Sequence, residues 1–145
     1  MALSLADIQR LPKTDLHVHL DGSLRLTTML ALASNQGIAL PADTPEGLAA
    51  ALHCGEVSGS LVEYLKAFET TLKVLQTEDA LYRAAYELSE DAAAETVRYM
   101  EVRYSPRLHT RGGLRLTAVV EAVLAGLWDA QTDHGVYANV ILCGI

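Results

Sequence analysis

Residues 14–20 read Thr-Asp-Leu-His-Val-His-Leu, and this stretch decides the fold. Side chains of a β-strand point alternately to its two faces, so an acid and two histidines are expected on one face and three aliphatic residues on the other. The two sets are Asp15, His17 and His19, and Leu16, Val18 and Leu20. We expect the aliphatic face to lie against helices and the histidine face to point into the interior of a barrel.

Helices and strands alternate along the rest of the chain. A polar arm ends at residues 11–13, and five helices are expected after it. The first spans 24–36 and is ended by Gly37, the second lies within 46–52, and the third follows Ser60, with Leu61, Leu65, Phe68 and Leu72 at helical spacing. The fourth runs from Thr77 to about Val97, and the fifth from Thr117 to His134 and Gly135. Two further strands are expected at 99–104 and 136–145. The order predicts an α/β fold with a parallel sheet. No helix follows the last apolar strand, so we expect the chain to be cut off after it.

Composition limits the possible functions. The chain has 145 residues, 50% of them hydrophobic, and a formal net charge of −7. This predicts one globular domain and argues against nucleic acid or an anionic membrane as a partner. Cys54 and Cys143 lie far apart and are expected as free thiols, and no leader peptide or membrane-spanning run is visible, so we expect a cytoplasmic protein. Five arginines are expected in a solvated loop: Arg98, Arg103, Arg107, Arg111 and Arg115.

His17 and His19 form the sharpest chemical signal. Two imidazoles at positions i and i+2 of a strand project to the same side, as two ligands of one metal ion must. Two solvated or core histidines would give the same pattern by chance. The pair stands at the carboxyl end of the first strand, where α/β folds bind their ligands, which favours the metal site.

Four segments carry a resemblance to a known family. Residues 11–23 (LPKTDLHVHLDGS) resemble the first strand of the adenosine deaminase family, the metal-dependent purine deaminases of the amidohydrolase superfamily. Residues 101–106 (EVRYSP) and 141–145 (ILCGI) resemble its second and third strands, and residues 64–68 (YLKAF) resemble the segment that covers its substrate pocket. The combination of HLDGS with a distant EVRYSP is specific, and the resemblance spans nearly the whole chain.

The resemblance implies a fold and a partial site. The fold is a (β/α)8 TIM barrel, of which residues 1–145 would be the N-terminal portion with about three strands. In that family, residues matching His17 and His19 bind Zn²⁺, the second histidine also lies against the substrate, and the residue matching Asp21 binds the ribose of a purine nucleoside. Asp21 has a second interpretation as a helix-capping turn residue. The family's proton-donating glutamate and its later histidine and aspartate ligands lie beyond Ile145, so no catalytic residue is expected in this chain.

The implied activity is zinc-dependent hydrolytic deamination of adenosine or deoxyadenosine to inosine and ammonia. Alternatives are deamination of a related compound, such as aminodeoxyfutalosine or adenine, and an inactive truncated barrel fragment. Adenine deaminases typically carry glutamate at the position of Asp21, which favours a nucleoside. A metal-dependent phosphoesterase of the histidinol-phosphatase type also begins with DLHxH, but it does not resemble EVRYSP. Cytidine-type deaminases carry a PCxxC motif that is absent here.

Four other polar residues have open roles. Ser105 stands either near the pocket mouth or at the end of the strand before Pro106. His109 follows the second strand in a basic loop, and it is the one other histidine near the expected mouth of the barrel. His53, in a loop-rich region, and His134, at a helix C-terminus, are not expected to bind metal.

Overall fold

The structure is a computed structural model that describes residues 3–52 and 61–144, with the helical backbone alone for residues 61–67. Its elements are α1 (Leu5–Arg10), β1 (Lys13–His19), α2 (Leu26–Gln36), α3 (Pro45–Ala51), α4 (Leu61–Val74), α5 (Glu78–Ala94), β2 (Val97–Tyr104), the 3-10 helix η1 (Pro106–His109), α6 (Leu116–His134) and β3 (Tyr137–Leu142).

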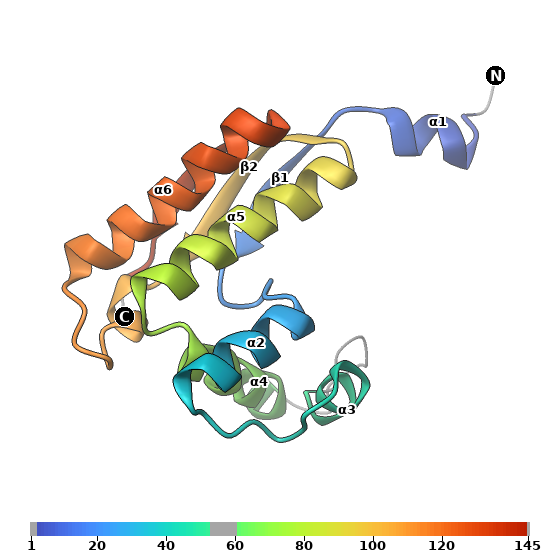
Figure 1. Cartoon of the computed structure of the whole chain (residues 1–145). Coiled ribbons are helices and arrows are strands. Elements are labelled where there is room, and N and C mark those ends of the chain that lie inside the picture. The colour runs from blue at the N-terminus through green and yellow to red at the C-terminus, as the bar shows by residue number, and fades with distance from the viewer. Residues whose placement is uncertain (1–2, 53–60, 145) are drawn as a thin grey trace.

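The three strands form one parallel sheet in the order β1-β2-β3. The predicted α/β class with a parallel sheet is therefore confirmed. Figure 1 shows α5 and α6 side by side across one face of the sheet, with α2, α3 and α4 grouped at the end where the strands finish. This arrangement puts the carboxyl end of β1 beside the α2–α4 group, where α/β proteins place their ligand sites.

Apolar side chains on the helix-facing side of the sheet build the core. Met100 and Val102 of the central strand are fully buried, and they join a cluster with aliphatic residues of α5 and α6. The two helices approach closely at Gly126 of α6, where a Cβ atom would overlap the carbonyl oxygen of Tyr82 in α5. Glycine therefore sets the spacing of the two helices that cover the sheet.

Several helix ends follow the sequence signals. The Thr77 hydroxyl accepts a hydrogen bond from the Ala80 amide at 3.2 Å and opens α5 as predicted. Gly37 and Gly135 end α2 and α6 with left-handed φ values of 65° and 72°. These ends were predictable because the capping chemistry is local.

The end of α5 was predicted wrongly. The helix stops at Ala94, and β2 begins at Val97 instead of continuing the helix to that residue. The chain turns at Thr96, which has a left-handed φ of 63°. The ammonium of Lys13 donates to the Glu95 carbonyl at 2.9 Å and to the Thr96 hydroxyl at 2.6 Å, and these contacts from a distant segment stabilise the turn.

The structure corrects four further expectations. The N-terminal arm contains α1, which the Ser4 and Asp7 side chains begin with a reciprocal capping box. Arg98 and Arg103 lie in β2 and not in a loop. Leu16 is 56% exposed although it belongs to the aliphatic set, because the register of β1 against β2 shifts between Asp15 and Val18. The same shift pairs Asp15 with Met100 of the apolar face, so Asp15 does not share the face of the two histidines as expected.

Side-chain bridges fix α2 against α5. The Arg25 guanidinium, which precedes α2, donates to both carboxylate oxygens of Asp91 and to Glu90 at 2.7 Å.

The free thiol of Cys143 is half-buried, whereas Cys54, His53 and Ser60 lie outside the described residues. Within the described ranges, no helix has the length and apolarity that crossing a membrane requires.

Candidate functional site

His17 and His19 stand together at the carboxyl end of β1. Their ring centroids lie 5.4 Å apart, and both residues are exposed. The Asp15 carboxylate accepts a hydrogen bond from the His17 amide at 3.0 Å, and the pairing of β1 with β2 is irregular between Asp15 and Val18. Such irregularities re-aim side chains, and here both imidazoles leave the same side of the strand.

The spacing of the two rings fits one zinc ion. Tetrahedral coordination with Zn–N bonds of about 2.1 Å places the centroids of two ligating imidazoles about 5 Å apart. The observed 5.4 Å agrees with this geometry. Within residues 3–52 and 61–144, no group of three or more His, Cys, Asp or Glu side chains could complete a metal site. The histidine pair therefore supplies two candidate ligands, and the described residues bring no third His, Cys, Asp or Glu into a metal-binding group with them.

Asp21 lies directly behind the histidine pair. It is only 6% exposed, and its Oδ1 atom stands 3.9 Å from Nδ1 of His19 with no hydrogen-bond partner among the described residues. Arg25 occupies the N-cap position of α2, and Asp21 makes no capping bond. The capping interpretation of Asp21 is thus wrong. A buried carboxylate with a free acceptor is suited to bind a hydroxyl donor.

Phe68 of α4 closes the site from the side of the helices. Its ring meets the His19 ring edge-on, with centroids 6.3 Å apart at 71°. A Cβ atom at Gly22 would come within 3.1 Å of the Phe68 ring, so glycine lets the ring approach the backbone after β1. Of residues 64–68, Phe68 is the one whose side chain is described. Its position agrees with the segment expected to cover a pocket.

The face of the sheet that carries the histidines holds several polar side chains, and Ile141 of β3, the register partner of Arg103, is an apolar member of it. Asn139 of β3 donates to the Tyr99 hydroxyl at 3.2 Å, and that hydroxyl donates to Glu101 at 3.1 Å. Arg103 pairs in register with His19, and its Nε atom is buried without a hydrogen-bond partner among the described residues. This face differs from the apolar face under α5 and α6, and it is the side on which chemistry can occur.

His109 is buried and belongs to the protein interior. Its side chain is fully enclosed, Nδ1 lies 2.9 Å from the Leu75 carbonyl oxygen, and its ring packs edge-on against Tyr104. A carbonyl oxygen can only accept a hydrogen bond, so Nδ1 of His109 carries the hydrogen and donates it. His109 does not extend into a basic loop beside the histidine pair, and its contacts indicate a structural role.

Burial lowers the pKa of the His109 imidazole below its ordinary value of 6.5, and the Leu75 hydrogen bond and the charge of Asp21 offset part of this effect. The folded state thus binds fewer protons than the unfolded state when the pH falls below about 6.5, so stability is lost on acidification. We expect the urea midpoint of the wild-type protein to fall between pH 7 and pH 5 by more than that of His109→Asn. Asparagine keeps a donor for Leu75 but does not titrate. Equal falls in the two proteins would contradict this prediction.

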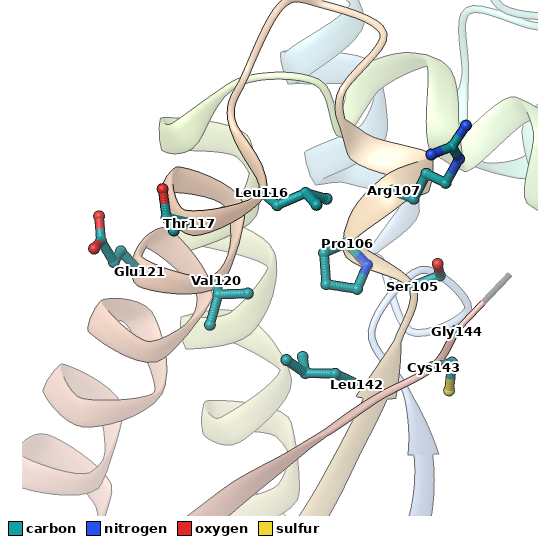
Figure 2. Close-up of a pocket in the computed structure, with 10 residues that line it drawn as sticks. All are labelled: Ser105, Pro106, Arg107, Leu116, Thr117, Val120, Glu121, Leu142, Cys143 and Gly144. Atoms are coloured by element: carbon teal, nitrogen blue, oxygen red, sulfur yellow. The ribbon is translucent and has the colours of Figure 1, made fainter.

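Ser105 lies in a different hollow from the histidines. It is 3% exposed, and its hydroxyl has no partner within the described ranges. It lines a mostly apolar cavity of about 460 Å³ between the start of α6 and the ends of β2 and β3. Figure 2 shows Pro106, Leu116, Val120 and Leu142 around this hollow. The hydroxyl ends a strand beside an apolar space, and it neither caps η1 nor contacts the histidine pair.

His134 is also remote from the site. It ends α6, its Nε2 atom lies 3.2 Å from the Tyr86 hydroxyl, and Glu90 is 3.9 Å away. These contacts link α6 to α5.

Comparison with known sequences agrees with the geometry. A family model described as adenosine deaminase matches residues 12–145. The chain is 44% identical over 138 residues to an adenosine deaminase of Enterococcus faecalis, covering 95% of this chain and 41% of that protein. It is 51% identical over 130 residues to an adenosine deaminase of Mycolicibacterium vanbaalenii, covering 89% of this chain and 36% of that protein. The chain thus spans about two fifths of these relatives.

Solved structures give the same picture. A zinc-bound amidohydrolase from Burkhoderia ambifaria matches with a TM-score of 0.81 and 30% identity, covering 98% of this chain and 39% of that one. An adenine deaminase from Arthrobacter aurescens matches with a TM-score of 0.80 and 31% identity, covering 90% and 39%. An N6-methyl-AMP deaminase from Arabidopsis thaliana matches with a TM-score of 0.69 and 31% identity, covering 93% and 40%.

Proposed function

Because the chain belongs to the adenosine deaminase family, we propose that it is the N-terminal portion of a zinc-dependent hydrolase that converts adenosine or deoxyadenosine to inosine and ammonia. The observation that carries this proposal is the His17–His19 pair, 5.4 Å apart, beside the buried carboxylate of Asp21. The pair has the spacing of two zinc ligands, and the carboxylate would accept a hydrogen bond from a substrate hydroxyl.

Residues 1–145 would form the first part of a single (β/α)8 barrel. In the described part of the chain, β1 and β3 each pair with one neighbour, so their outer edges are open to further strands. An eight-stranded barrel takes about 250 residues, and the relatives are longer than this chain. The polar face with the histidines would line the barrel interior, and α5 and α6 would lie outside it.

His17 and His19 would hold the zinc ion in this site. Zinc supplies a bound water whose pKa is lowered toward neutrality. The two histidines would fix the position of the metal relative to the sheet. His19 also faces Asp21 through Nδ1, which leaves Nε2 of His19 free to bind the metal. The proton-donating glutamate and the remaining ligands would come from the part of the barrel beyond Ile145.

Asp21 and Phe68 would bind the substrate. The unpartnered Oδ1 of Asp21 can accept a hydrogen bond from a ribose hydroxyl, and a free base has no such hydroxyl. The Phe68 ring beside His19 would lie over the purine and exclude water from it. The role of Asp21 favours a nucleoside over adenine.

A second candidate function is deamination of a related adenine compound. Similar structures include an adenine deaminase and an N6-methyl-AMP deaminase. Aminodeoxyfutalosine, a modified adenosine, is a further candidate substrate. A truncated, inactive barrel fragment is the remaining alternative. We place the protein in the cytoplasm on its composition and its small-molecule substrate.

The test uses the intact protein that contains this chain. Its mass, its zinc content and its turnover of adenosine, adenine and N6-methyl-AMP would be measured on one preparation. We expect about one zinc ion per chain and inosine formation from adenosine at a higher kcat/KM than for the other two compounds. A protein of 145 residues without stoichiometric zinc would refute the enzymatic proposal. Preference for adenine would refute the role given to Asp21.

A further inference from the structure

The C-terminal end of α4 is held by side chains from other parts of the fold. The last carbonyl groups of a helix have no partner within the helix and need outside donors. The Gln36 amide of α2 donates to the Val74 carbonyl at 2.9 Å. His109 of η1 donates through Nδ1 to the Leu75 carbonyl at 2.9 Å. The end of α4 is therefore joined both to α2 and to the loop that follows β2.

Gln76 strengthens the second of these links. Its side-chain amide donates to the Leu72 carbonyl at 2.7 Å and to the Leu108 carbonyl at 3.0 Å, and its oxygen accepts from the Gly112 amide at 3.3 Å. A Cβ atom at Gly112 would lie 2.7 Å from the Gln76 carbonyl oxygen. Glycine thus allows two loops that are distant in sequence to touch.

These contacts bear on the site because α4 also carries Phe68. Phe68 precedes Leu75 by seven residues, about 10 Å along a helix. The buried residues Leu72 and Val74 pack between them, so a shift at one end of this segment moves the other. The Phe68 ring contacts His19 and lies against Gly22.

We propose that Gln76 and His109 are positioning residues that hold Phe68 over His19, and that they thereby shape the nucleoside site. This inference rests on the proposed function for the identity of the ligand. Both residues contact other parts of the protein. His109 is enclosed beneath η1, and Gln76 bonds to backbone groups of α4 and of the loop after β2. Their role is to fix α4 relative to the strand that pairs with the histidine strand.

The test compares four variants of the intact protein that contains this chain, each freed of metal. His109→Phe keeps the ring volume but removes the donor to Leu75, whereas His109→Asn keeps a donor at the same position. Gln76→Ala removes three hydrogen bonds, and Gln9→Ala, an exposed position on α1, is the matched control. The readouts are the nuclear Overhauser contact between the Phe68 and His19 rings, hydrogen exchange of the amides of residues 69–74, and the dissociation constant of adenosine.

We expect His109→Phe and Gln76→Ala to weaken the Phe68–His19 contact, to speed amide exchange and to weaken adenosine binding about ten-fold. His109→Asn and Gln9→Ala should behave as wild type. A wild-type ring contact and affinity in both disrupting variants would overturn the inference, as would faster exchange with unchanged affinity. If either His109→Phe or Gln76→Ala fails to fold, the remaining one of these two variants tests the inference. If the wild-type protein binds no adenosine, the proposed function fails, and the ring contact alone decides whether these residues position Phe68.

Discussion

Replacing His17 with alanine is expected to lower the zinc affinity of the intact protein and its kcat/KM for adenosine by more than about 100-fold. Removing a residue that only hydrogen-bonds to a metal ligand can already cost that much, and removing a ligand itself should cost more. His17 and His19 are the pair that would hold zinc, so the loss of His17 leaves a single imidazole. The His17 side chain is exposed, and its removal should leave the fold intact. Zinc analysis, steady-state kinetics and far-ultraviolet circular dichroism would check the three statements.

His134→Ala is the matched control for this variant. His134 contacts Tyr86 at the junction of α5 and α6. Its replacement should leave zinc content and turnover unchanged. If His17→Ala keeps one zinc ion per chain, or if both variants lose zinc equally, the assignment of the β1 pair as ligands is wrong.

The largest effect on stability is expected for Gly126→Ala. Alanine normally stabilises the interior of a helix relative to glycine by about 1 kcal/mol. At this position the new methyl group would overlap the Tyr82 carbonyl and come within 3.1 Å of the Ala85 Cβ atom. The backbone of α5 must move, and overpacking of this kind costs about 1–3 kcal/mol. The sign of the usual glycine-to-alanine effect should therefore reverse.

Urea unfolding followed by circular dichroism measures this change. Ala125→Gly provides the comparison, because Ala125 is an exposed neighbour on α6 and should show the helix-propensity effect alone. A Gly126→Ala variant that is more stable than wild type would show that α5 and α6 can separate without cost. That result would contradict the close packing of α5 against α6 at Gly126.

The helix boundaries show which local signals could be read from the sequence. Thr77, Gly37 and Gly135 act within one turn of their own helix, so their roles were predictable. The capping box at Ser4 and Asp7 was an equally local signal, and it was overlooked in a segment interpreted as a polar arm. The end of α5 was different, because Lys13, more than 80 residues away, stabilises the turn at Thr96.

In the candidate site, too, some features could be predicted from the sequence and others could not. Alternation along one strand placed His17 and His19 on a common side, and their pairing was predictable from two positions. The burial of Asp21 and the approach of Phe68 to His19 depend on where α4 lies, which no local pattern reports. Gln76 was missed altogether. Its partners Leu108 and Gly112 are more than 30 residues away, and a lone glutamine between two helices carries no signal.

The sequence by itself determined the parallel α/β order, the histidine pair and the family, because each depends on residue types at short, regular spacing. Only the tertiary structure decided that His109 is an interior donor, that Asp21 is a buried acceptor and not a cap, and that the Ser105 hydroxyl is buried without a partner among the described residues. The physical reason is that the burial of a side chain and its hydrogen bonds depend on the residues packed around it. Those surroundings are assembled from α4, η1 and β2, which meet only after the chain has folded.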